Sequence, residues 1–285
     1  MAIVLAVVAA AGWGASDFFG GDASRHRTPV LVVVAVSELV GLAFLGPLLV
    51  ARGVPPPTDP RLLLAVVAGI AVTIELSLIY LALGRGDAFI TAPVGALGAA
   101  VAVAIGLAGG DPLDLTIAAG LLLALLGAAV SAWTSGTASS HATVLQTAWV
   151  CLGAAAAVGT MLSCFHAAGQ LDAYWVTAIE HASTALSAGL AALDVSRGSL
   201  RRTLPPSSQL PALARIAAVC IGGDLAYAAA SHGGALSIVS AISSLYPVTT
   251  VLLGRVLQQR HATRVQLFGI TLALSGAALL GAAAG

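Results

Sequence analysis

Five carboxylates lie within stretches of the chain that are otherwise apolar. They are Asp17, Glu38, Glu75, Glu180 and Asp224. The basic residues are all arginines, and none lies near the middle of such a stretch. An ionisable side chain at membrane depth costs at least about 2.5 kcal/mol, so it usually faces a cavity and marks a pathway. We therefore expect an acidic cavity that exchanges protons or binds a cationic or zwitterionic amine.

The first of these acids lies in the sequence GWGASDFFGG. Trp13 and Asp17 are four residues apart, so they share one face of a helix. An aromatic ring beside a carboxylate is a suitable wall for an amine. Two simpler interpretations stay open: Asp17 lies near the end of the first apolar stretch, where it could reach lipid headgroups, and Trp13 could serve packing alone.

The other acids differ in how clearly they indicate a cavity. Glu38 and Glu75 lie further from the ends of their stretches, which favours a cavity. Glu180 and His181 are adjacent and therefore about 100° apart on a helix, so a local Glu–His pair between helices is the alternative. Asp224 follows two glycines, where the backbone could loosen and line a cavity.

Composition places the chain in the membrane. It has 285 residues, of which 59% are hydrophobic and only 8% charged, and its mean hydropathy is +0.99. A soluble domain of this length carries far more charge. The net charge is zero, so nothing indicates a nucleic-acid partner. The three cysteines lie in apolar runs without C-x-x-C spacing, so we interpret them as small core residues and expect no metal and no cofactor.

The apolar runs predict an all-α integral membrane protein. A spanning helix needs about 20 mostly apolar residues, and the chain contains about ten such segments, separated by Gly- and Pro-rich breaks. They are residues 3–19, 30–50, 62–83, 88–109, 115–133, 144–167, 173–193, 211–230, 235–257 and 265–284.

The chain repeats itself at a nearly constant offset. A shift of 147 residues aligns Tyr80 with Tyr227, and a shift of 149 aligns residues 120–130 with 269–279 at seven of eleven positions. We predict two five-helix repeats, residues 1–136 and 137–285. Because five is odd, the second repeat enters the membrane from the opposite face, an arrangement that gives alternating access around a midplane site.

Two prolines and two tyrosines complete the expected pathway. Pro93 and Pro247 each lie inside a predicted span, where proline bends a helix, and we expect them to be gating kinks, with static packing as the alternative. Tyr80 and Tyr227 occupy matched repeat positions. Both lie near helix ends, so an aromatic belt at the membrane interface explains them equally well.

Several stretches together resemble the EamA-like branch of the drug/metabolite transporter superfamily. They are GWG with SDF at 12–18, IYLALGRGDAFITAPVGAL (79–97), YAAASHGGALSIVSAISSLYPVTTVLLGRV (227–256) and TRVQLFGITLALSGAALLG (263–281). The resemblance implies ten helices in two inverted halves, with a cavity built mainly from helices one, three, four, six, eight and nine. Thr91, in the second stretch, joins the expected pathway. The chain departs from the family pattern after the ninth helix, where it reads Gln258-Gln259-Arg260 instead of Gly-Glu; the matching point in the first half is Gly110-Asp111.

The expected function is secondary active transport of a small metabolite such as an amino acid, an amine or a drug. Members of the family move such molecules mostly outward, so we expect an exporter in a cell membrane, the bacterial inner membrane, with protons or another ion as coupling partner. Lipids surround it, and a homodimer is left open. The sequence has no enzyme motif. An intramembrane enzyme acting on a lipid-linked substrate is the alternative, and a channel-like or structural bundle is a third.

Overall fold

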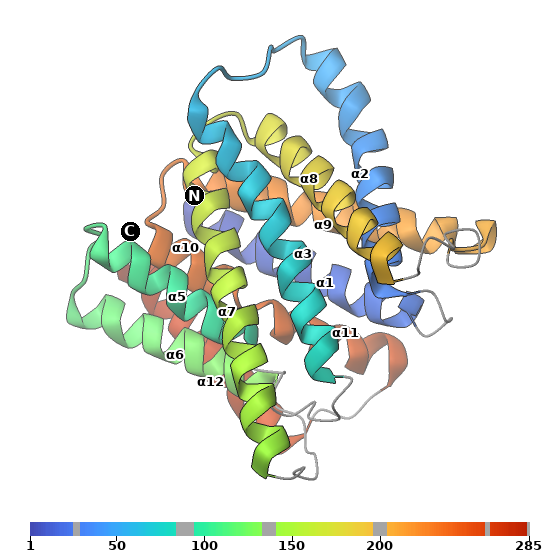
Figure 1. Cartoon of the computed structure of the whole chain (residues 1–285). Coiled ribbons are helices and arrows are strands. Elements are labelled where there is room, and N and C mark those ends of the chain that lie inside the picture. The colour runs from blue at the N-terminus through green and yellow to red at the C-terminus, as the bar shows by residue number, and fades with distance from the viewer. Residues whose placement is uncertain (25–28, 84–93, 133–140, 196–203, 260–262, 284–285) are drawn as a thin grey trace.

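The computed structural model describes residues 1–24, 29–83, 94–132, 141–195, 204–259 and 263–283. Within these ranges every regular element is helical (Figure 1). The helices are α1 (Ala2–Ser24), α2 (Val30–Arg52), α3 (Leu63–Leu83), α5 (Val94–Ala108), α6 (Leu115–Ser131), α7 (His141–Gly169), α8 (Ala173–Val195), α9 (Leu210–Ser231), α10 (Leu236–Ser243), α11 (Tyr246–Gln258) and α12 (Arg264–Ala283), with 3-10 turns at Pro60–Leu62 and Ser207–Gln209.

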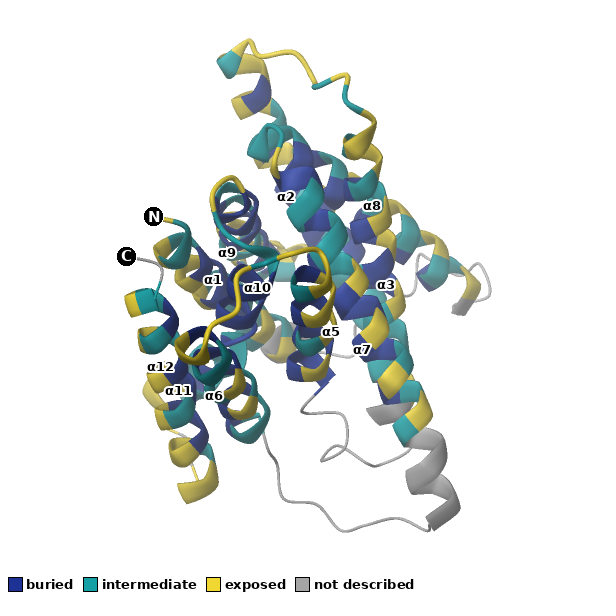
Figure 2. Cartoon of the chain, turned by 90° about the vertical axis from the view of Figure 1, so that its left-hand side faces the viewer, coloured by how far each residue is buried: buried dark blue, intermediate teal, exposed yellow. Residues whose placement is uncertain are grey.

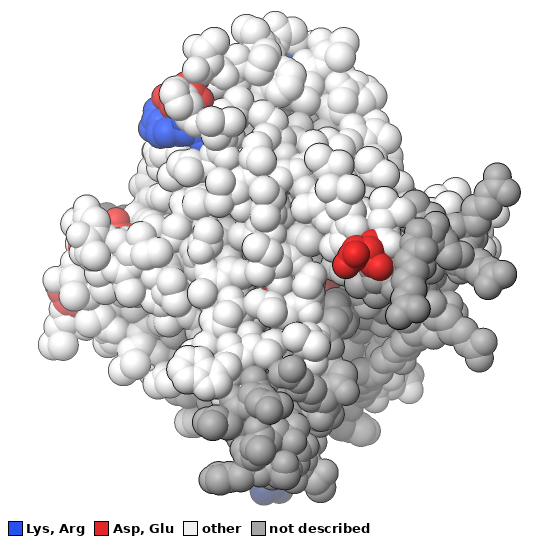
Figure 3. Space-filling view, viewed as in Figure 1, with Lys and Arg blue, Asp and Glu red and all other residues white. Residues whose placement is uncertain are grey.

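The outer surface is suited to lipid. Among the described residues, seven helical stretches are long and apolar enough to cross a membrane, and α5 and α6 are shorter apolar helices. Large apolar side chains such as Leu122, Leu186 and Phe268 are exposed on the outside. The buried faces point inward (Figure 2), and one broad face carries few charged side chains (Figure 3). The protein is therefore a multi-pass membrane protein, while the count of ten spans stays a prediction.

The most extensive helix contacts recur when the two halves are exchanged. Helix α1 packs against α9, and in the same way α7, the first helix of the second half, packs against α3. Helix α5 packs against α7, and α10 and α11 pack against α1. The second helices of the halves, α2 and α8, pack on each other, as do the last, α6 and α12. Such a pattern is expected of two repeats.

The paired last helices approach each other at the glycines that the 149-residue shift aligns. A Cβ on Gly127 would meet backbone atoms of Ala273, and one on Gly276 would meet backbone atoms of Ala124. Small residues let membrane helices approach this closely. Residue numbers rise along α6 as they fall along α12, since Gly120 also lies against Leu280. The two helices therefore run antiparallel.

The second helices are also antiparallel, and polar side chains join them. The C-terminal residue of α2, Arg52, forms two hydrogen bonds with Asp172, directly before α8, at 2.9 and 2.7 Å. Further along, Glu38 of α2 contacts His181 of α8. These contacts set the rotation of α2 and α8 about their axes and thus direct both Glu38 and Glu180 toward the centre of the molecule.

Pro247 lies at a break and not at a kink. Helix α10 ends at Ser243, α11 begins at Tyr246, and Pro247 occupies its first turn. A proline costs nothing at this position because the N–H it lacks would be unpaired there. The prediction of a bent ninth helix is thus corrected to two shorter helices, which leave Ser244 and Tyr246 at the centre of the bundle. Pro93 lies outside the described residues.

A further polar contact joins the halves at the other end of α10. The carboxylate of Asp111, which follows α5, accepts a hydrogen bond of 2.7 Å from the backbone N–H of Ser237. A carboxylate at the start of a helix accepts a hydrogen bond from a backbone N–H of the first turn, which has no acceptor within the helix. Asp111 lies at the point of the first half that matches the end of the ninth helix, where the family pattern has Gly-Glu.

Candidate functional site

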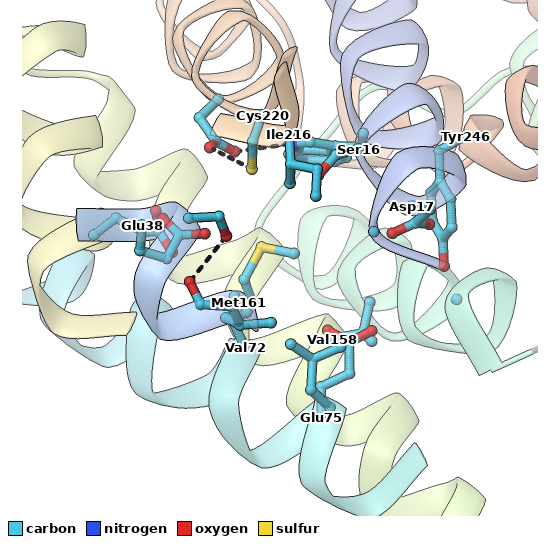
Figure 4. Close-up of a pocket in the computed structure, with 18 of the residues that line it drawn as sticks. Ser16, Asp17, Glu38, Val72, Glu75, Val158, Met161, Ile216, Cys220 and Tyr246 are labelled. Carbon is cyan, nitrogen blue, oxygen red and sulfur yellow. Dashed lines mark hydrogen bonds between the residues drawn. The ribbon is translucent and has the colours of Figure 1, made fainter. Parts of the chain in front are cut away.

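A cavity of about 230 Å³ lies between the two halves. Its walls come from α1, α2, α3 and α5 of the first half and from α7, α8, α9 and α11 of the second (Figure 4). These include the six helices that the family resemblance implied, together with α2 and α8. Gly20, Gly21 and Val30 also line the cavity, so it extends toward the connection between α1 and α2.

All five carboxylates identified in the apolar stretches line this one cavity, although they come from five different helices. No arginine is among its lining residues in the described part of the chain. Helix α1 continues for seven residues beyond Asp17, to Ser24, so Asp17 is not at a helix end. Asp17 lines the cavity, and it is exposed. The arrangement makes the cavity strongly acidic.

One end of the cavity holds a group of mutually paired side chains, which we call the bridged end. At its centre is His181, which is fully buried. Its Nδ1 contacts a carboxylate oxygen of Glu38, and its Nε2 lies 3.0 Å from Oδ2 of Asp224. One imidazole thus joins carboxylates from α2 and α9. Its own helix, α8, packs against both.

Two further residues hold the Asp224 carboxylate. The indole Nε1 of Trp13 donates a hydrogen bond of 2.7 Å to Oδ1, and the Cys220 thiol lies 3.4 Å from Oδ2 as a weaker donor. Cys220 is one turn before Asp224 on α9, and it lines the cavity. The interpretation of this cysteine as an apolar core residue is therefore wrong. It considered only the apolar run around Cys220 and not the carboxylate of Asp224 one turn further along the helix.

The third carboxylate of the bridged end, Glu180, is tied to its own helix. Thr184 donates a hydrogen bond of 2.7 Å to Glu180, and its hydroxyl also lies 3.2 Å from the carbonyl oxygen of Gly69 on α3. A Cβ on Gly69 would meet the backbone of Glu180, so α3 and α8 are in close contact here. Glu180 and His181, although adjacent, thus both belong to the bridged end.

The other end of the cavity, which we call the open end, has a different character. It contains Asp17 of α1, Glu75 of α3 and Tyr246 of α11. Asp17 and Tyr246 lie next to each other, and Glu75 approaches from below (Figure 4). The charges of the two carboxylates are near enough to act on each other. Neither has a hydrogen-bond or ion-pair partner among the described residues.

The predicted aromatic residues divide between the wall and the layer behind it. Trp13 lines the cavity and also packs on Tyr227, with ring centroids 5.2 Å apart. Tyr227 is fully buried, stacks on Phe165 and donates to the Leu162 carbonyl at 2.9 Å. Tyr227 therefore supports Trp13 from behind and is not at a membrane interface. The side chain of Tyr80 and all of Thr91 lie outside the described residues.

The bridged end brings several metal-binding residue types together. Donor atoms of His181, Cys220 and Asp224 lie within 4.8 Å of one another, as do those of Glu38, Glu180 and His181. Both sets need a free lone pair on His181, but each of its ring nitrogens already faces a carboxylate. An imidazole placed between two acceptors acts as a double donor. We therefore assign an ion pair with Glu38 and a hydrogen bond with Asp224, and no metal, to His181.

Outside the membrane-spanning segments, the Arg52–Asp172 pair fixes the loop between α7 and α8. The Arg52 guanidinium lowers the pKa of the Asp172 carboxyl, and backbone N–H groups of Trp175 and Tyr174 add to this effect. The same guanidinium lies 4.0 Å above the ring of Tyr174. Bidentate geometry makes such a pair stronger than an ordinary surface ion pair.

Comparison with known proteins identifies the family. The sequence model of the EamA-like transporter family matches residues 1–133 and 142–282, once in each half. No curated protein matches the chain. Among solved structures, a crystal structure of a protein with 18% sequence identity has a TM-score of 0.78 and covers 98% of both chains, which shows a shared fold.

The family consists of transporters, so the enzyme alternative receives no support from it. With a multi-pass helical fold, an acidic cavity between two similar halves and a family match in each half, the chain belongs to the EamA-like transporter family.

Proposed function

We propose that the protein is a secondary active transporter that exports a small amine-bearing metabolite in exchange for protons. The acidic cavity is the observation that carries this proposal. Five carboxylates and no arginine line it among the described residues, and a surface of one charge sign concentrates ligands of the opposite sign. A cation is the natural occupant.

The composition of the wall narrows the substrate. Aromatic and aliphatic side chains such as Trp13, Phe165 and Met161 alternate with the acids. Apolar walls with a few fixed polar groups suit a small organic molecule better than a hydrated inorganic ion. The volume of about 230 Å³ suits a molecule the size of an amino acid or a short amine.

Alternating access is the proposed mechanism, and inverted halves would provide it. Helices α2 and α8, the second of each half, are antiparallel, and so are the aligned helices α6 and α12. Corresponding helices that run in opposite directions support an inverted repeat, in which the halves rock about a central site. The break before Pro247, beside Tyr246 in the wall, would serve as a gating hinge.

Export is the direction that the family resemblance implies, and we place the protein in the bacterial inner membrane. The proposed partners are the substrate, the coupling proton and the surrounding lipid. No soluble partner is required, since a proton gradient can supply the energy.

The test is transport by purified protein in liposomes under an imposed pH gradient. A panel of ethanolamine, putrescine, tyramine, amino acids and nucleobases would be screened for accumulation. We expect uptake of at least one amine against its gradient. Asp194→Asn is the matched control, since Asp194 is exposed near the end of α8, away from the cavity. Accumulation of no amine, or uptake that ignores the pH gradient, would contradict the proposal.

A further inference from the structure

The bridged end contains a proton that its geometry requires. A neutral imidazole has one N–H donor and one lone pair. His181 faces a carboxylate at each nitrogen, Glu38 at Nδ1 and Asp224 at Nε2. With both carboxylates ionised, both nitrogens must carry hydrogen, and this is the form that we assign to the bridge. The group then holds one proton more than neutral histidine between two carboxylates.

Loss of that proton would break one of the two contacts. The lone pair exposed on the ring would then face the lone pairs of a carboxylate oxygen, which is repulsive. In a buried position such repulsion is screened little, so the carboxylate would move away from the ring. The bridge therefore has two arrangements, closed with the proton and open on one side without it.

The surrounding groups add negative charge and no second cation. Helix α2 contributes Glu38, α8 contributes Glu180, and α9 contributes Asp224 and Cys220. Helix α1 contributes only the neutral indole of Trp13, and α3 faces α8 with Gly69 and the hydroxyl of Thr73. His181 is thus the only basic side chain in contact with this group among the described residues.

The bridge also joins the two halves of the protein. Glu38 belongs to the first half, and its partner His181 belongs to the second. Trp13 of the first half likewise bonds to Asp224 of the second. Glu38, Asp224 and Cys220 line the cavity, whereas His181 lies behind them. A proton can therefore reach His181 through carboxylates that the cavity exposes.

We propose that the Glu38–His181–Asp224 bridge is the binding site of the coupling proton, separate from the open end, where Asp17 and Glu75 take the ammonium group of the substrate. This assignment rests on the proposed function. A substrate cation at the open end raises the positive charge of the cavity, and one N–H bond of His181 then breaks. The electron pair stays on nitrogen, and the proton passes to water in the cavity. The contact between His181 and the carboxylate at that nitrogen then opens. Proton release is thereby linked to the relative movement of the two halves.

The first test separates coupling from transport. His181→Gln would be compared with wild type in proteoliposomes, with the amine identified in the panel as the labelled probe. We expect exchange of labelled for unlabelled amine to remain within about threefold, while accumulation driven by the pH gradient falls about 10-fold or more. His166→Gln is the matched control, because His166 is also a membrane histidine but packs on Tyr227 outside the bridge.

Three results would overturn the assignment. His181→Gln could accumulate amine as wild type does, or a folded His181→Gln could lose exchange together with coupling. Wild type could also show no proton-coupled uptake. That result would contradict the proposed function itself, and it is distinguished from the other two because it is seen in wild type alone.

A second test needs no substitution at the bridge and applies even if His181→Gln does not fold. The chain has six histidines, and a variant that keeps only His181 would be labelled with ¹⁵N in its ring. We expect nitrogen shifts of a doubly protonated ring at neutral pH, and the signal of one unprotonated nitrogen once the amine saturates the protein. An unprotonated nitrogen without amine, or a ring that does not respond to amine, contradicts the proposal.

Discussion

The two ends of the cavity use the same side-chain chemistry in opposite ways. At the bridged end, Glu38 and Asp224 are both paired with one histidine, and Asp224 receives a further hydrogen bond from Trp13. At the open end, Asp17 and Glu75 both line the cavity without a hydrogen-bond or ion-pair partner among the described residues. Asp17 is exposed and Glu75 is half-buried, whereas Glu38 and Asp224 are buried. The open end therefore leaves two carboxylates accessible, which suits a cation that comes and goes.

Substitutions at the open end should reduce amine transport more than substitutions at the bridged end. Replacing both of its carboxylates, Asp17→Asn with Glu75→Gln, removes the charge that holds the ammonium group. We expect kcat/KM for amine transport to fall roughly 100-fold or more, with each single change costing less. Initial rates of labelled amine uptake measure this loss.

Asp194→Asn serves as the charge-matched control for each single change, since it also removes one helix carboxylate. Transport by the double variant at more than about half of the wild-type rate would mean that substrate does not bind at the open end, and the comparison would fail.

The shape of the open end can be altered without touching its charge. A Cβ at Gly95 would meet the hydroxyl oxygen of Tyr246, so Gly95→Ala should push this ring into the space beside Asp17. We expect KM to rise about 10-fold with kcat changing less, as for a loss of ground-state binding.

Adding Tyr246→Phe to Gly95→Ala should recover part of this loss, since the hydroxyl is the atom in the way. Gly189→Ala is the control, because a Cβ there meets nothing within 4 Å. Unchanged KM in Gly95→Ala would place Tyr246 outside the substrate's path.

Substitutions at the bridged end should have a smaller effect, and the effect should be on the coupling of amine accumulation to the pH gradient. Trp13→Phe keeps a ring against Tyr227 but removes the hydrogen bond of 2.7 Å to Asp224. A hydrogen bond to a charged group contributes about 1.5–3 kcal/mol, and part of this should appear as a loss of accumulation under a pH gradient. Cys220→Ser should change accumulation less, because its thiol is a distant donor at 3.4 Å. Equal effects of the two changes would show that Trp13 does not orient Asp224.

The Arg52–Asp172 pair offers a contrast in which pairing serves stability alone. Asp172→Asn should lower the free energy of unfolding by about 1 kcal/mol, measured as a lower Tm in detergent, with transport unchanged. The pKa of Asp172 is lowered in the folded protein, so its contribution is present above the unfolded pKa of about 4 and is lost as pH falls through the folded pKa.

The difference in Tm between wild type and Asp172→Asn should therefore be full at pH 7 and shrink in acid. Asp194→Asn should show no such difference. A Tm gap that stays constant as the pH falls well below 4 would mean that the carboxylate charge does not stabilise the loop.

The sequence already contained much of this description. Charges that interrupt apolar runs are few, and each is costly in lipid, so inspection of the chain found Asp17, Glu38, Glu75, Glu180 and Asp224, all of which line the cavity. The glycines of α6 and α12 were equally predictable, because small residues at a regular spacing indicate close helix packing.

The division into paired and unpaired acids was not predictable from one sequence. It depends on how α2, α8 and α9 rotate and slide against one another, and the apolar pattern leaves both free because these helices are apolar on most faces. Two signals were nonetheless present. Cys220 lies four residues before Asp224, on the same helix face, and Tyr246 directly precedes the proline at which the ninth helix breaks.

The most direct test of the account is the number of protons released when amine binds. Purified protein in weakly buffered detergent solution would be titrated with the transported amine while a pH indicator reports the protons. We expect about one proton released per amine bound in wild type, binding without release in His181→Gln, and neither binding nor release in the Asp17→Asn, Glu75→Gln variant. Binding without release in wild type, or release that persists in His181→Gln, would contradict a cavity with separate ends for substrate and proton.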